Sequence, residues 1–342
     1  MSFVIAPKIV WDISPVDQYG NYLSHFLSFD DVGNIITCSD VVVGRISAGT
    51  GSIIEYGYNI EVSSDYHFQN LSQAANGQIA YMTFYSYGLL NSNSLLPISS
   101  DDANFANNKT SWIVYDGSYI FYQTSNGYLN YVLLPSSANA IYSIVPFGSA
   151  FLNAFATVNT SISDTIIVDN ILYFRNGGLY AYNLKTGTLK TNLENVAGFC
   201  FSGDGNIVVS YTDSNSNKML AFVNSLTLSI MNQVPTSFTA DLLVKVGWVY
   251  WGVIQTGNNT TGFSSAIISF DAYGIARGSI GLTNQPISSL QYNSGFLYAT
   301  NGVPIIKIDP GVPHLPPVLK NPSDPAGTVK NMTLNGYLNW RR

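Results

Sequence analysis

The sequence has little charge. Only 10% of its 342 residues are charged, whereas an average soluble domain has about a quarter. Lys and Arg number 14 against 20 Asp and Glu, for a formal net charge of -6, so the cationic surface that neutralises phosphate groups is missing. We therefore expect no nucleic-acid partner. The polar surface must be built from Ser, Thr, Asn, Gln and Tyr, and such a surface suits packing against other protein.

Cysteine and histidine are also scarce. Cys38 and Cys200 both stand in apolar, strand-like runs and are expected to be small buried side chains, although a disulfide between them stays open. His25, His67 and His314 are scattered and lack the close spacing of zinc ligands. We therefore expect no metal site, and each His is interpreted as a structural residue.

Long apolar runs are absent. No stretch approaches the about 18 residues that span a bilayer, and the start of the chain lacks the basic and apolar regions of a secretory signal. The prediction is a chain with neither a membrane span nor a leader of its own, unless a leader has already been removed.

Short apolar or alternating runs bounded by Gly, Asn, Asp and Ser recur throughout, which is the pattern of an all-β protein. Seven of them share one form, a Gly or Asn turn followed by an apolar or aromatic strand. Their spacing averages about 44 residues, inside the period of about 40 to 50 that is typical of propeller blades. The seven units are Gly33–Ile36, Gly77–Tyr81, Gly117–Phe121, Asn170–Phe174, Gly205–Val209, Gly247–Trp251 and Gly295–Tyr298.

This repeat predicts a seven-bladed β-propeller of four-stranded antiparallel sheets over residues 1–308. One small sheet cannot bury both of its faces alone, so neighbouring sheets cover one another around an axis. Closure of such a ring usually uses a strand from the opposite terminus, and either Phe3–Ile5 or Ile9–Trp11 could supply it.

One unit carries a family resemblance. The stretch from Leu172 to Gly187, with Leu179-Tyr180-Ala181-Tyr182 followed by a Lys-Thr-Gly turn, resembles the repeat of pyrroloquinoline-quinone-type and related, WD-like propellers. The match is good in this unit and partial elsewhere, and the cofactor ligands of those enzymes do not map onto this chain. The resemblance implies the fold, and we expect no cofactor.

From residue 309 onward, prolines dominate. Pro310, Pro313, Pro316, Pro317, Pro322 and Pro325 predict an extended, semi-rigid C-terminal arm over residues 309–342. The arm ends in large apolar side chains at Tyr337, Leu338 and Trp340. These residues favour an arm that lies on a neighbouring subunit over a solvated, disordered tail, which is the alternative.

No catalytic set is recognisable. The sequence has no Gly-x-Ser-x-Gly elbow, and Asp213–Asn217 imitates the start of a calcium loop but lacks its Gly and its bidentate Glu, so we interpret it as a hairpin loop. The pairs Asp30-Asp31 and Asp101-Asp102 could hold a cation or act as acid and base, but turn chemistry explains them equally well. We therefore expect no enzyme activity.

The glycosylation acceptor pattern Asn-x-Ser/Thr is frequent. Its candidate acceptors are Asn70, Asn108, Asn159, Asn258, Asn259 and Asn331. Together with the uncharged, Tyr-rich composition they indicate an extracellular or particle-borne protein.

Two functional hypotheses remain. The first is a non-enzymatic structural or attachment protein of a virion or surface assembly, since the composition resembles virion proteins of archaeal viruses. Its partners would be other assembly proteins, contacted through the disc faces and the arm, or a host surface glycan or receptor. The alternative is a secreted propeller enzyme or carbohydrate-binding module with a site at one end of the central channel.

Overall fold

The computed structural model is built from β-strands alone in the residues that it describes. These are residues 4–24, 27–59, 68, 70–73, 78–82, 87–101, 110–115, 119–124, 129–133, 144–146, 163–258, 262–283, 286–300 and 303–311. Within them the strands form seven four-stranded sheets, and every pairing between neighbours is antiparallel. The described residues contain no helix long and apolar enough to cross a membrane.

Six sheets use four consecutive strands. The first holds β2 (Ser28–Phe29), β3 (Ile35–Cys38), β4 (Val42–Ile46) and β5 (Ile53–Asn59), and the second holds β6 (Asn70–Gln73), β7 (Ile79–Met82), β8 (Tyr87–Leu90) and β9 (Pro97–Asp101). The third holds β10 (Thr110–Tyr115), β11 (Tyr119–Thr124), β12 (Leu129–Leu133) and β13 (Ile144–Pro146), and the fourth holds β14 (Ser163–Val168), β15 (Ile171–Asn176), β16 (Gly178–Asn183) and β17 (Leu189–Glu194). The fifth holds β18 (Val196–Phe201), β19 (Asn206–Thr212), β20 (Lys218–Asn224) and β21 (Ile230–Pro235), and the sixth holds β22 (Asp241–Val246), β23 (Val249–Asn258), β24 (Gly262–Phe270) and β25 (Ala276–Thr283).

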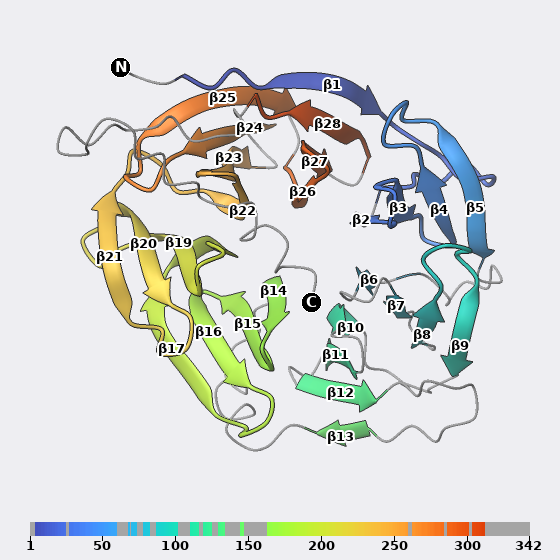
Figure 1. Cartoon of the computed structure of the whole chain (residues 1–342), viewed down its shortest axis with the longest axis horizontal. Coiled ribbons are helices and arrows are strands. Elements are labelled where there is room, and N and C mark those ends of the chain that lie inside the picture. The colour runs from blue at the N-terminus through green and yellow to red at the C-terminus, as the bar shows by residue number, and fades with distance from the viewer. Residues whose placement is uncertain are drawn as a thin grey trace, which may run out of the picture.

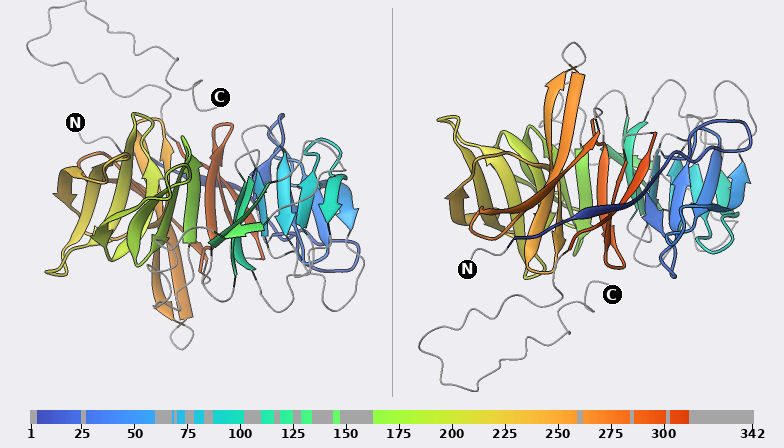
Figure 2. Two further views of the ribbon diagram at one scale, coloured as in Figure 1. Left: turned by 90° about the horizontal axis from the view of Figure 1, so that it is seen from below. Right: turned by 90° about the horizontal axis from the view of Figure 1, so that it is seen from above.

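The sheets stand around a common axis as a ring (Figure 1). The first strand of each sheet lies nearest the axis and the fourth lies at the rim. Seen from the side the ring is a flat disc, from which the β23–β24 hairpin projects beyond one face (Figure 2). This architecture confirms the predicted all-β propeller of four-stranded antiparallel sheets.

The last sheet closes the ring with a strand from the other end of the chain. β26 (Ser289–Asn293), β27 (Phe296–Thr300) and β28 (Ile305–Asp309) are joined at the rim by β1 (Lys8–Ile13), in which Ile9 pairs with Ile308 and Trp11 with Lys307. Of the two predicted candidates for the closing strand, the structure therefore uses Ile9–Trp11, whereas Ile5 of the other candidate, Phe3–Ile5, belongs to no strand. β28 also extends to Asp309, one residue past the predicted boundary of the propeller, because Asp309 still pairs with Lys8.

Each predicted repeat unit supplies the second strand of one sheet, from β3 and β7 through to β27. The described turn residues that open these strands all have a positive φ: Gly33 (90°), Asn170 (63°), Gly205 (82°), Gly247 (62°) and Gly295 (91°). Only Gly, and after it Asn or Asp, takes this left-handed conformation readily. The recurring Gly or Asn is thus a backbone requirement of the turn between the first and second strands.

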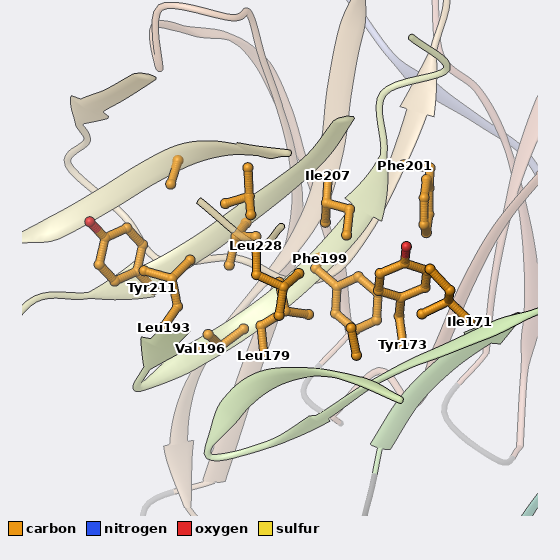
Figure 3. Packing of buried hydrophobic residues seen from close by; sticks show 14 residues of the cluster. Ile171, Tyr173, Leu179, Leu193, Val196, Phe199, Phe201, Ile207, Tyr211 and Leu228 are labelled. Carbon is orange, nitrogen blue, oxygen red and sulfur yellow. The ribbon is translucent and has the colours of Figure 1, made fainter. Parts of the chain in front are cut away.

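The core lies between neighbouring sheets. In one cluster, aromatic and branched side chains of β15 and β16 pack against those of β18 and β19, with Tyr173 edge-on to Phe201 at 5.0 Å between ring centroids (Figure 3). A second cluster joins the sixth and closing sheets around the fully buried Trp251. Each sheet thus buries its faces on its neighbours, as the repeat predicts.

Candidate interaction surfaces

The acceptor asparagines that the structure describes lie in different settings. Asn70 is the first residue of β6, the strand of its sheet nearest the axis, whereas Asn258 is the last residue of β23, at the end of the projecting hairpin (Figure 2). Asn108, Asn159, Asn259 and Asn331 lie outside the described residues. Of the two described acceptors, Asn258 is therefore the one that is carried clear of the disc.

The predicted contact residues of the arm, Tyr337, Leu338 and Trp340, also lie outside the described residues, as do His25, His67 and His314. In the part of the chain that the structure describes, no group of three or more His, Cys, Asp or Glu side chains could hold a metal ion.

The calcium-like stretch is a hairpin loop between β19 and β20, as predicted. Asp213 accepts hydrogen bonds from the backbone N–H groups of Asn215 (2.9 Å) and Asn217 (2.8 Å) and from Asn217 Nδ2 (3.0 Å). These bonds, of which that from the Asn217 side chain contributes most, lower the pKa of Asp213. These hydrogen bonds of the carboxylate all come from residues of its own loop.

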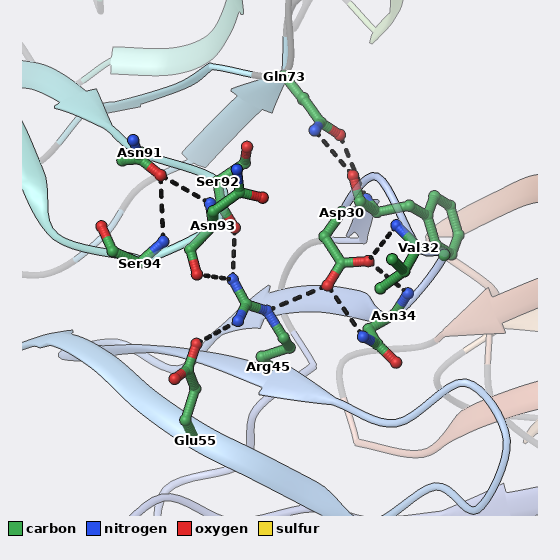
Figure 4. A network of polar contacts seen from close by, with 12 residues as sticks. Asp30, Val32, Asn34, Arg45, Glu55, Gln73, Asn91, Ser92, Asn93 and Ser94 are labelled. Atoms are coloured by element: carbon green, nitrogen blue, oxygen red, sulfur yellow. Dashed lines mark hydrogen bonds and ion pairs between the residues drawn. The ribbon is translucent and has the colours of Figure 1, made fainter.

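Asp30 is likewise a turn residue. Its carboxylate accepts hydrogen bonds from the backbone of Val32 and from both the backbone and the side chain of Asn34. It also pairs with the buried Arg45, at 3.2 Å between Oδ2 and Nε (Figure 4). Of the second predicted Asp pair, Asp101 ends β9 and Asp102 lies outside the described residues.

Arg45 connects two sheets. Besides Asp30 it pairs with Glu55 on the adjacent strand, and its Nη2 donates to the backbone carbonyls of Ser92 (2.5 Å) and Asn93 (2.7 Å) in the β8–β9 turn of the next sheet. All its polar contacts are thus within the protein (Figure 4). A buried cation that is surrounded by anions and carbonyls positions the sheets.

Lys307 repeats this arrangement at the closure. It stands in the third strand of its sheet, as Arg45 does, and its Nζ donates to the carbonyl of Ala48 (2.5 Å) in the β4–β5 turn of the next sheet. The ammonium lies 3.8 Å from the centroid of the Phe296 ring, and burial lowers its pKa. At other joints, Lys190 donates to Leu226 and Tyr173 to Ser225, both in the β20–β21 turn.

Both cysteines are free. Cys38 ends β3 and Cys200 lies in β18, two different sheets, so they do not form the disulfide that the sequence left open. Burial raises the pKa of Cys38, and it raises that of Cys200 to about 12. Neither thiol is therefore nucleophilic at neutral pH.

Two clusters hold ten of the sixteen large apolar side chains that are exposed among the described residues. The first, here called the tyrosine patch, consists of Val16, Tyr19, Tyr22, Ile54 and Tyr56. Tyr56 donates to the carbonyl of Val16 (3.0 Å), and Val16 forms a β-bridge with Tyr22. Asp17, inside this loop, is buried and hydrogen-bonded to Ser39, so its carboxylate is not exposed in the patch.

The second cluster, here called the β21 rim, consists of Leu226, Ile230, Met231, Tyr273 and Ile275. The first three lie in β21 and in the turn before it. The other two flank Gly274 in the β24–β25 turn, and a Cβ on Gly274 would lie 3.2 Å from Val234 of β21. The two clusters are far apart, because β5 and β21 lie at opposite rims of the ring (Figure 1).

Neither cluster was predicted. The β21 rim left a trace in the sequence, because no charged residue occurs between Lys218 and Asp241. The tyrosine patch left none, since residues 16–22 and 54–56 meet only when β1 has closed the ring beside the first sheet.

No family model and no curated protein matches the chain. Solved structures do. One chain of a crystal structure of a mitotic checkpoint complex is similar at a TM-score of 0.64 and 10% identity, over 88% of this chain and 93% of that one. The β-propeller domain of Cps50 (Swd1) from Myceliophteria thermophila is similar at a TM-score of 0.61 and 10% identity, over 89% of this chain and 99% of that one. These likenesses establish the β-propeller fold.

Proposed function

We propose that the protein is a non-enzymatic interaction disc, a structural or attachment component of a virion or another surface assembly that binds other proteins through its rim. The observation that carries the proposal is the pair of uncharged, apolar clusters at opposite sides of the ring. Large exposed apolar patches on soluble proteins typically mark interaction sites, and Tyr is enriched among the residues that dominate interface energies.

The use of charge supports the same proposal. Arg45, Lys190 and Lys307 are engaged in joining sheets to one another. Of the two similar structures named above, one is a β-propeller domain and the other belongs to a mitotic checkpoint complex, by their titles. The specific setting of a virion or surface assembly depends on the composition of the chain alone.

The test has two arms. Mass spectrometry of purified particles and cell-surface fractions should recover the chain in constant ratio to the other assembly proteins. The variant Tyr19→Ser/Tyr56→Ser should lower its incorporation at least tenfold, while Val32→Ser, which alters an exposed apolar side chain outside both clusters, should leave it unchanged. Recovery only as a free protein, or equal incorporation of both variants, would contradict the proposal.

A further inference from the structure

β21 differs from the other strands at the rim. The fourth strands of the seven described sheets are β5, β9, β13, β17, β21, β25 and β1. Each of these with at least five residues carries a charged residue except β21, whose sequence is Ile-Met-Asn-Gln-Val-Pro. Charged side chains on an edge strand discourage pairing with other chains, and β21 lacks them.

The outer edge of β21 is unpaired among the residues that the structure describes. The strand pairs with β20 from Ile230 to Pro235 and is the last strand of its sheet, so no strand among the described residues covers its other side. The neighbouring β25 is partly covered, since the N–H of Ile5 donates to the carbonyl of Arg277 (2.8 Å). A register shift occurs where β20 pairs with β21, but similar shifts occur at the pairings of β5, β17 and β1, so it does not set β21 apart.

The side chains along this edge suit an apolar partner strand. Ile230 and Met231 are exposed on β21, while Tyr273 and Ile275 stand exposed beside its C-terminal half. A strand added here would gain main-chain hydrogen bonds and would cover these side chains at once.

The sequence beyond the described residues contains a segment of matching character. After the last proline of the arm, Pro325, the run Thr328-Val329-Lys330-Asn331-Met332-Thr333-Leu334 is rich in β-branched residues and lies between Gly327 and Gly336. The prolines between 310 and 325 favour an extended spacer of about 3.1 Å per residue. Over residues 310–325 such a spacer would be about 50 Å long, which is long enough for the run to reach a second copy.

We infer that residues 328–334 of one copy add as a fifth strand to β21 of a second copy, with the apolar residues after Gly336 covering the β21 rim. The inference rests on the proposed function, because it names a partner for one of its two surfaces. Donor and acceptor differ, so the contact is heterologous and joins copies into rings or open chains rather than symmetric dimers.

The sharpest test is a disulfide between separately purified full-length variants. Met231→Cys and Met332→Cys proteins, mixed and mildly oxidised, should give a cross-linked species of twice the chain mass, because paired strands bring Cα atoms within disulfide range. The native Cys38 is buried and Cys200 is partly buried, and the pKa of each thiol is raised, so both should stay unreactive. Ile54→Cys mixed with Met332→Cys is the matched control, since Ile54 is equally exposed on the charged strand β5.

A cross-link at Met231 that exceeds the Ile54 control at least tenfold supports the inference. Equal yields, or a bond that forms only when both cysteines are in one chain, overturn it. Sedimentation velocity adds an independent measure. Under conditions in which the wild-type protein sediments as oligomers, the Met231→Lys variant should sediment as a monomer. If that variant self-associates normally the inference fails, whereas loss of assembly incorporation by the Tyr19→Ser/Tyr56→Ser variant alone bears on the proposed function.

Discussion

The closing sheet and the β18–β21 sheet have the same four-stranded layout but different outer edges. In the closing sheet, β28 receives β1 from almost 300 residues away in the sequence, and β1 carries Lys8 and Asp12 on the rim. In the β18–β21 sheet the outer strand follows directly in sequence and carries no charge. The chain thus adds a strand from a distant segment, β1, to the outer edge of one of its own sheets. Among the rim strands, β21 has the edge best suited to receive another added strand.

The joints between sheets differ from the rim edges in energy. Arg45 is buried among Asp30, Glu55 and two carbonyls. Arg45→Met should lower the free energy of unfolding by about 3 to 5 kcal/mol, because it leaves the buried Asp30 carboxylate without its cation. Lys8→Met removes only an exposed pair with Asp309 and should cost under about 1 kcal/mol. Urea unfolding of both variants measures the difference, and equal losses would show that the joint does not hold the sheets together.

The two edges should also respond differently to truncation of an apolar side chain. Ile308 of β28 is fully buried in the core between the sixth and closing sheets, whereas Ile230 of β21 is exposed. Ile308→Ala should cost about 2 to 5 kcal/mol and Ile230→Ala less than about 1 kcal/mol. Thermal and urea unfolding of dilute protein provide the measurement. A large loss for Ile230→Ala under monomeric conditions would mean that the β21 edge is already covered within one chain.

Replacing a glycine by alanine should cost more stability in a repeat turn than in a rim strand, by a smaller amount than in the comparisons above. Gly205 has a φ of 82° and open space around its Cα, so Gly205→Ala should cost about 1 to 2 kcal/mol from the backbone alone. Gly281 in β25 has equally open space without a positive φ, so Gly281→Ala should be neutral or slightly stabilising. Matched urea titrations would compare them. No difference would remove the backbone explanation of the repeat.

The smallest effect should appear only at alkaline pH. Burial raises the pKa of Tyr298 in the closing sheet to about 12, above the value of about 10 in an unfolded chain. The phenol therefore keeps its proton to a higher pH in the folded state than in the unfolded chain. The stability that this difference contributes is complete below pH 10 and is lost as the pH rises toward 12. Tyr298→Phe should unfold with a shallower pH dependence in that window. An unchanged slope would contradict the burial of this phenol.

The fold was predictable because its signal is local. Gly33, Gly205 and Gly295 are needed for the backbone of one turn each, and the strand-like apolar runs after them repeat at an interval of about 44 residues, which is typical of propeller blades. The closing strand was predictable only as one of two apolar runs near the start of the chain, Phe3–Ile5 or Ile9–Trp11, because the choice between them depends on which run pairs with β28.

The interaction surfaces were not predictable, because they are made by contacts distant in sequence. Tyr56 is 40 residues from Val16 in sequence but donates a hydrogen bond to its carbonyl. Tyr273 lies beside the β21 edge only because Gly274 packs on Val234. The two backbone carbonyls that accept hydrogen bonds from Arg45 lie 47 and 48 residues further on, in the next sheet. An isolated Arg in an apolar run gives no sign of which carbonyls it will bind.

Amide hydrogen exchange across a concentration series tests the central claim most directly. As the protein self-associates, residues 230–235 and 328–334 should gain protection together, while residues 53–57 of β5 stay unchanged. Exchange in β21 that does not depend on concentration, or protection gained equally by both rim strands, would contradict the account.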